Sequence, residues 1–281
     1  MRAVVLDSAG QPVLANVPEP EGPGEIVRVL ACGLCGSDVE KLVPASAGRV
    51  LGHEIVAATL QGHRVAPVHH RGCGACERCR SGHASTCEVF PHETIRPGGF
   101  AERVVANGWV ELPDGIDAAR GTAVEPLACV LRALPRMPEG RVLVVGQGFI
   151  GRLFATMLAR RGDEVFAVDA RPERSGREPD GEVDAAVLAA PGGAEAAVRW
   201  VKPGGTILVF ADAGMLPAAA VYRRELTLVG SRSATPERMA EAAALLPELD
   251  LPEPTVLPLE RFAEGLALYR RGQAMKIVFI P

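Results

Sequence analysis

Two patterns of hydrophobic and polar residues divide the chain. Before Ala118, short apolar runs alternate with Gly and Pro clusters, which is typical of a β-rich domain of short strands. After Gly140, continuous apolar runs are separated by helical segments, which indicates a parallel sheet covered on both faces. The apolar runs of the first part are residues 3–6, 25–30, 52–57 and 64–68, and those of the second part are 142–145, 164–168, 183–188, 206–210 and 226–229.

Helical periodicity appears at three places. From Asp117, apolar side chains recur at roughly helical spacing, which predicts a helix or helix pair that carries Glu125 inward. Further helices are predicted at Ile150–Arg161 and Leu259–Arg271, and the second of these precedes a strand at Lys276–Ile280.

Length and composition are those of a two-domain globular protein. A chain of 281 residues is too long for one ordinary core, and its hydrophobic fraction of 48% is typical. The formal net charge of −4 and the lack of a dense Lys/Arg block lead us to expect no nucleic acid partner. No apolar run approaches the roughly 18 residues of a membrane span, and Asp7 interrupts the first run before a signal-peptide core can form. We therefore expect a cytoplasmic protein without membrane association.

Four of the seven cysteines crowd into one short segment, namely Cys73, Cys76, Cys79 and Cys87. In a reducing cytosol, such a cluster is more typical of metal binding than of disulfides. Four thiolates at these spacings can close around one Zn²⁺ and leave no open position for a substrate. We predict a structural zinc site, with paired disulfides or an iron–sulfur cluster as alternatives.

A second candidate metal site combines separated residues. Cys35 lies in the motif Cys-Gly-Leu-Cys-Gly-Ser-Asp, His53 and Glu54 follow it, and Glu125 comes much later. Such a set leaves a position for water or alcohol, as a catalytic zinc requires. Taken singly, each residue has a simpler explanation as a structural histidine, a surface carboxylate or a small buried thiol.

A glycine loop opens the second part of the chain. Gly146, Gly148 and Gly151 form the pattern G-x-G-x-x-G with Phe149 and Ile150, between a predicted strand and a predicted helix. These glycines permit a tight turn and the close approach of a pyrophosphate to the helix N-terminus. The pattern predicts a dinucleotide site.

Asp169 ends the next apolar strand, where a carboxylate can accept a hydrogen bond from the adenosine ribose. This favours NAD over NADP, because a 2′-phosphate would meet a negative charge. Arg171 could instead lie on the adenine or pair with a 2′-phosphate, and Asp169 could be only a turn residue.

Taken in order, these motifs closely resemble the zinc-containing medium-chain dehydrogenase/reductase family. The matching segments are residues 32–38, 52–54, 73–87, 98–102, 124–128, 146–151 and 202–205, which together span nearly the whole chain. The resemblance implies a GroES-like catalytic domain with a structural zinc lobe at 1–129, a Rossmann NAD-binding domain at 130–253 and a C-terminal return at 254–281.

The resemblance also implies roles for individual residues. Cys35 and His53 would bind the catalytic zinc, with Glu54 beside it as an intermittent ligand. The Glu-Pro-Leu motif of the polyol, threonine and glucose dehydrogenase branches implies a further carboxylate ligand, here Glu125. Cys32 and Cys129 match no ligand position.

The chain departs from the family in length and in its proton path. The segment from Asp169 to Val183 has little room for the usual helix and strand, so we expect a trimmed sheet of about five parallel strands. Glu40 replaces a relay histidine, so a proton would pass through Ser37 to Glu40 or water, unless Glu40 is merely a solvated carboxylate. His69 and His70 lie where the threonine dehydrogenase branch has a pocket histidine, and His70 is the candidate for the substrate pocket; a structural role is the alternative.

The resulting expectation is a zinc-dependent oxidoreductase that transfers a hydride between an alcohol and NAD, the alcohol being a secondary alcohol, polyol or sugar. The alternative is a non-catalytic, cofactor-binding sensor. The run 226–229 would form a sheet edge that pairs across a dimer axis in relatives, so we expect a homodimer or homotetramer. Phe90, Phe100 and Trp109 are expected to be core residues rather than walls of the substrate pocket.

Overall fold

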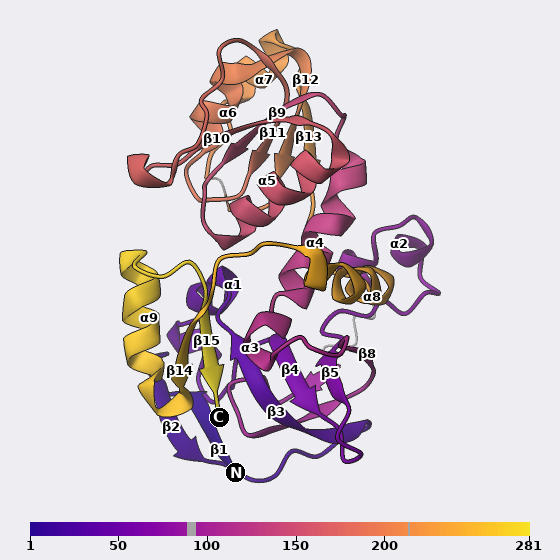
Figure 1. The fold of residues 1–281 in the computed structure, drawn as a ribbon, viewed down its shortest axis with the longest axis vertical. Coiled ribbons are helices and arrows are strands. Elements are labelled where there is room, and N and C mark those ends of the chain that lie inside the picture. The colour runs from indigo at the N-terminus through magenta and orange to yellow at the C-terminus, as the bar shows by residue number, and fades with distance from the viewer. Residues whose placement is uncertain (89–93, 213) are drawn as a thin grey trace. The chain divides into compact units, whose positions relative to one another are not determined.

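A computed structural model describes residues 1–88, 94–212 and 214–281 (Figure 1). The chain forms two compact units: Met1–Ala128 together with Ala234–Pro281, and Cys129–Ser233. The first unit is thus discontinuous in sequence, and its C-terminal part begins at Ala234, earlier than the expected position 254.

The early return to the first unit has a physical reason in helix α8 (Pro236–Leu245). This helix packs against strand β8 (Trp109–Glu111) and buries Met239. Arg120 then donates side-chain hydrogen bonds to the carbonyl oxygens of Leu246 and Leu249, just beyond the helix. Residues 234–253 therefore complete the first unit rather than the second.

An antiparallel sheet dominates the first unit, in the order β14-β15-β3-β4-β5-β8, with β7 paired to β3 and β6 paired to β7. Only β14 and β15 pair in parallel within it, among the described residues. Its strands are β3 (Glu25–Gly33), β4 (Glu54–Ala58), β5 (Arg64–Pro67), β6 (Ile95–Arg96), β7 (Arg103–Ala106), β8, β14 (Thr255–Pro258) and β15 (Ile277–Ile280). A separate antiparallel pair consists of β1 (Arg2–Leu6) and β2 (Pro12–Asn16).

Helices of the first unit are short. They are α1 (Gly36–Glu40), α2 (Glu77–Arg80), α3 (Ala118–Gly121), α8 and α9 (Phe262–Arg271), and the boundary with the second unit falls inside α4 (Val124–Ala133). The helix pair predicted after Asp117 corresponds to α3 and α4, and Glu125 is buried in the first turn of α4. The β-rich first domain predicted from the apolar runs is confirmed.

Three phenylalanines tie the C-terminal segment into the core of the first unit. Phe262 and Phe279 stack with their ring centroids 4.6 Å apart, and Phe100 meets both rings edge-on at 4.9 and 5.7 Å. Such pairs stabilise a fold by about 0.5–1.5 kcal/mol each beyond their burial. Phe100 is a core residue as expected and Trp109 packs partly buried against the same core, whereas Phe90 lies outside the described residues.

The second unit contains a five-stranded parallel sheet in the order β10-β9-β11-β12-β13. Its elements are β9 (Arg141–Val145), α5 (Phe149–Arg161), β10 (Glu164–Val168), β11 (Val183–Leu188), α6 (Ala194–Trp200), β12 (Val201–Val209), α7 (Ala218–Arg223) and β13 (Thr227–Gly230). The prediction of a trimmed parallel sheet of about five strands is confirmed.

Apolar side chains fill both faces of this sheet. Leu143 and Val145 of β9 join a buried cluster with Ala197 of α6. Successive strand residues point to opposite faces, so Val142 and Val144 lie on the other face, where they are equally buried. This explains why the strand reads as a continuous apolar run.

A short return of the chain covers the outer edge of β10. The amide of Ala167 donates to the carbonyl of Arg177 at 2.9 Å, and the amide of Gly176 donates to the carbonyl of Ala167 at 3.0 Å. The side chain of Arg177 then lies over the ring of Phe166, 4.6 Å from its centroid, and pairs with Glu164. The abbreviated segment after Asp169 therefore closes this edge of the sheet with its own backbone.

Within the described part of the chain, no helix has the length and apolar character that crossing a bilayer requires.

Candidate functional site

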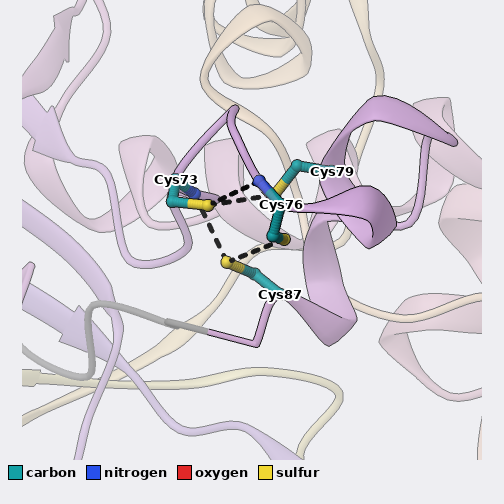
Figure 2. A group of neighbouring side chains, drawn as sticks. All are labelled: Cys73, Cys76, Cys79 and Cys87. Carbon is teal, nitrogen blue, oxygen red and sulfur yellow. Dashed lines mark hydrogen bonds between the residues drawn. The ribbon is translucent and has the colours of Figure 1, made fainter.

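The four clustered cysteines converge in the lobe that follows β5 (Figure 2). The sulfur atoms of Cys76 and Cys87 are 3.8 Å apart, and those of Cys73 and Cys79 are 4.0 Å apart. Four sulfurs at about 2.3 Å from a tetrahedral zinc would be separated by about 3.8 Å. All seven cysteines of the chain are free thiols. The lobe therefore has the dimensions of a zinc–tetrathiolate site.

Backbone amides favour the thiolate form in this lobe. The amides of Cys76 and Ala75 donate to the sulfur of Cys73 at 3.3 and 3.4 Å, and they lower the pKa of its thiol. The amides of Glu88 and Cys79 lower the pKa of Cys76 to about 6. Because the thiolate is the metal-binding form, these donors prepare Cys73 and Cys76 for a cation, whereas burial raises the pKa of Cys79 to about 12.

A second group of ligand atoms belongs to Cys35, His53 and Glu54, which lie within 4.8 Å of one another. The strand register explains why they meet. In the antiparallel pair of β3 and β4, Gly33 lies opposite Glu54, so the residues just after β3 approach those just before β4. One sulfur, one imidazole and one carboxylate make a donor set suited to zinc with an open position.

Asp38 organises this group. Its carboxylate accepts from the amides of Cys35 and Gly52, at 3.2 and 3.3 Å, and lies 3.3 Å from Nδ1 of His53. Burial favours the neutral acid, but the neighbouring His53 outweighs it and lowers the pKa of Asp38. With Nδ1 directed at a carboxylate, Nε2 is the nitrogen left to bind a metal.

The glycine loop occupies the predicted turn between β9 and α5. Gly146 has a φ of 95°, and a Cβ at Gly151 would overlap the carbonyl oxygen of Gly146. A Cβ at Gly148, the N-cap of α5, would meet nothing within 4 Å. Two glycines thus serve the turn itself, whereas the third leaves open space where a pyrophosphate could approach. Phe149 and Ile150 form the first turn of α5.

Asp169 lies beside this loop, just beyond β10. One carboxylate oxygen accepts from the amide of Gln147 at 2.6 Å, and the other accepts from the amide of Arg171 at 2.9 Å. Each oxygen keeps lone pairs for a further donor. Asp169 therefore lies beside the glycine loop with the backbone of Arg171 next to it, and the cofactor-binding roles of both residues stay predictions.

Comparison with known proteins covers both units. Residues 22–114 match the family model of the alcohol dehydrogenase GroES-like domain. D-altritol 5-dehydrogenase of Agrobacterium fabrum is 30% identical over 303 residues, covering 88% of each chain. The chain belongs to the zinc-containing medium-chain dehydrogenase/reductase family.

Other members agree in sequence and fold. L-galactonate-5-dehydrogenase of Escherichia coli is 29% identical over 281 residues, covering 83% of each chain. The crystal structure of galactitol-1-phosphate dehydrogenase from Escherichia coli superposes with a TM-score of 0.84 at 24% identity, over 100% of both chains. The GroES-like and Rossmann folds are thereby confirmed, and this family member is an oxidoreductase of the alcohol and polyol dehydrogenase type.

Glu54, which the family resemblance places beside the zinc, forms a buried ion pair with Lys276. The two side chains are only 2% and 5% exposed, and Nζ of Lys276 also donates to the carbonyl of Leu34 at 3.4 Å. Lys276 immediately precedes β15 and was not singled out in the sequence, because 222 residues separate it from its partner.

Glu125, expected as a further ligand in this family, is buried at the start of α4. The described group of mutually close ligand atoms contains Cys35, His53 and Glu54 and does not include Glu125. Its ligand role stays a prediction without support from the geometry.

The relay residues lie on α1. The hydroxyl of Ser37 donates to the sulfur of Cys35 at 3.5 Å, which places it against the candidate zinc ligand. Glu40 ends the helix with an exposed side chain, so a solvated carboxylate describes it as well as a relay does.

Two further residues lie at this end of the site. Tyr269 of α9 has its hydroxyl 3.0 Å from where a Cβ on Gly36 would be, and burial, then Cys35 and Glu54, raises its pKa to about 12. The ring of His69 stacks on His53, and His70 packs edge-on against His69. The sequence interpretation favoured His70 over His69. Adjacent positions in a loop do not reveal which of the two rings stacks on His53.

Proposed function

We propose that this chain uses zinc to transfer a hydride between a polyhydroxylated alcohol and NAD. The observation that carries the proposal is the convergence of Cys35, His53 and Glu54 into an open donor set, in a chain that also holds a dinucleotide-type glycine loop. We assign the four-cysteine lobe to a structural zinc and the second group to a catalytic zinc, with Glu54 as the third, intermittent ligand.

Bound at Cys35 and His53, zinc would supply a Lewis acid for the alcohol oxygen. Residues of the chain itself would orient the ligating histidine and take the proton from the substrate hydroxyl. Asp38 fixes the edge of His53 so that Nε2 faces the metal position. Ser37 can accept the proton of the substrate hydroxyl and pass it to water or to the exposed carboxylate of Glu40.

We infer that NAD is preferred to NADP. The carboxylate of Asp169 lies at the glycine loop, held by the amides of Gln147 and Arg171, and it would repel a 2′-phosphate. An Asp169→Ala variant is expected to bind NADPH more tightly relative to NADH than the wild type does. A wild-type chain that already favoured NADPH would contradict this inference.

For the substrate, a polyol or sugar derivative is supported by the two relatives, which act by name on altritol and on galactonate. For assembly, a homodimer or homotetramer through the edge strand β13 is supported by the exposed Leu228 on that strand, and sedimentation velocity tests it. The thiol-rich metal sites support a reducing, cytoplasmic location.

The decisive test follows NADH absorbance over a panel of hexitols, aldonates and simple secondary alcohols, with zinc content measured in parallel. His53→Ala should abolish turnover and remove zinc from the Cys35 group while NAD binding persists. His63→Ala is the matched control, since that imidazole is exposed in the first unit. Unchanged turnover in Cys35→Ala would refute the zinc assignment. If the wild type oxidised no alcohol in the panel, the alternative of a non-catalytic, cofactor-binding sensor would be favoured.

A further inference from the structure

We propose that His69 is a positioning residue for the catalytic metal, because its imidazole stacks on His53 and holds that ring in its ligating orientation. The inference rests on the proposed function, since it concerns the zinc assigned to Cys35 and His53. It gives His69 a role that acts through His53 rather than on the metal or the substrate.

Three imidazoles pack against one another in sequence. The rings of His53 and His69 are nearly parallel, with centroids 4.8 Å apart and an interplanar angle of 26°. His70 meets His69 edge-on, with its centroid 4.2 Å from that of His69 and an interplanar angle of 73°. Each ring therefore restricts the next.

The contact with Asp38 alone leaves the plane of the His53 ring undetermined, and stacking on His69 fixes it. Asp38 touches His53 only at its edge, through Nδ1, at 3.3 Å. The side-chain torsion that turns a histidine ring has broad, shallow minima, so one edge contact does not fix the plane of the ring. A flat group that packs against the face of the ring does fix this plane, and the ring of His69 packs against the face of His53.

The backbone holds His69 firmly enough for this task. Val68, the residue between β5 and His69, is buried and donates its amide to the carbonyl of Gly108 at 3.0 Å. The buried hydroxyl of Thr94 donates to the carbonyl of His69 itself. The backbone that carries the ring is thus held at His69 and at the residue before it.

His69 is separate from the ligand set. The described group of mutually close ligand atoms contains Cys35, His53 and Glu54, without His69. A flat ring outside the ligand set can support a ligating imidazole without taking a ligand position itself.

The test compares ring shape with volume at this position. His69→Phe keeps a flat ring, His69→Leu keeps volume without one, and His69→Ala removes both. Each zinc-loaded variant is mixed with a chromogenic chelator, and zinc release from the two sites is followed. The four-cysteine lobe is an internal reference within the same molecule, and His63→Ala is the control for losing an imidazole elsewhere.

We expect about tenfold faster zinc release from the Cys35 site in the Leu and Ala variants, the lower end of the roughly 10–100-fold loss of affinity that follows mutation of hydrogen-bonding partners of ligating histidines. The Phe variant should release zinc like the wild type, and release from the cysteine lobe should not change. The visible spectrum of the cobalt-substituted Cys35 site should shift in Leu and Ala but not in Phe, which a merely structural role would not produce.

Two results would overturn the inference: wild-type release and spectrum in the Leu variant, or equal behaviour of Phe and Leu. If the Ala variant does not fold, the comparison of Phe with Leu decides alone. A wild-type chain that binds zinc only in the cysteine lobe would instead refute the proposed catalytic metal, so the two failures are distinguishable.

Discussion

Replacing Lys276 with methionine removes the cation from the buried ion pair with Glu54. Methionine keeps much of the apolar stem but has no charge, so the change is mainly electrostatic. The two side chains are 5% and 2% exposed, so water cannot replace the lost partner without opening the fold. The carboxylate of Glu54 would be left buried and unpaired.

Breaking one side of such a pair typically costs about 3–5 kcal/mol, a large part of the roughly 5–15 kcal/mol that stabilises a native protein. With a urea m-value of about 3 kcal/mol per molar, the unfolding midpoint should fall by about 1–1.7 M. Glu54→Gln should cost a similar amount, because it leaves the ammonium unpaired instead. The double variant, which leaves neither charge, should recover much of the loss.

Urea unfolding followed by tryptophan fluorescence can isolate the relevant unit. The chain has two tryptophans, Trp109 in the first unit and Trp200 in the second. On a Trp200→Phe background, fluorescence reports only the unit that contains Lys276. All variants are compared at the same chelator concentration, because metal binding would add its own stabilisation.

An unchanged midpoint in Lys276→Met would refute the view that this pair is buried and coupled. Strictly additive losses in the double variant would do the same, since they would show that the two charges do not stabilise each other.

Three further outcomes follow from the geometry. Gly33→Ala should cost about 1–3 kcal/mol in urea unfolding, since its Cβ would overlap the carboxylate of Glu54; an unaltered midpoint would speak against the close packing there. Gly148→Ala should leave the melting temperature unchanged but weaken NADH binding, measured by fluorescence titration. Gly151→Ala should lower the melting temperature, because its Cβ would overlap the turn. Equal effects of the two variants would contradict the assignment of Gly148 to the cofactor and Gly151 to the turn. The raised pKa of Tyr269, about 12, means that its stabilisation is complete below pH 10 and is lost as the pH rises towards 12. The melting temperature of Tyr269→Phe should therefore fall less steeply over that range than that of the wild type, and parallel curves would refute the burial argument.

The sequence predicts best what depends on local pattern. The continuous run 142–145 can be interpreted as a buried strand because both of its faces are covered, and the cysteine spacings indicate a compact ligand set. Lys276 escapes such reasoning because its partner lies 222 positions away. The choice between His69 and His70 also lies beyond it, because loop geometry selects which of two adjacent rings stacks on His53.

Glu125 shows what a sequence motif leaves undetermined even when the residue itself is found. Its motif and its burial were both anticipated, yet neither states how far α4 places the carboxylate from Cys35. A family motif identifies a candidate ligand, whereas membership in a donor set is a matter of distances between segments far apart in sequence. Asp38 was quoted in its motif but given no role, because its importance appears only once the amides of Cys35 and Gly52 are seen to converge on it.

The covered edge of β10 affects how the parallel sheet could grow. Residues 176 and 177 already use the outward amide and carbonyl of Ala167, so a strand from another molecule could not pair with these groups on that side. In the described chain, β13 at the opposite edge pairs only with β12. A sheet that can be extended at only one edge can pair there with one other sheet, and no further sheet can then be added. The proposed contact through β13 would therefore join one partner without the capacity to polymerise through β10.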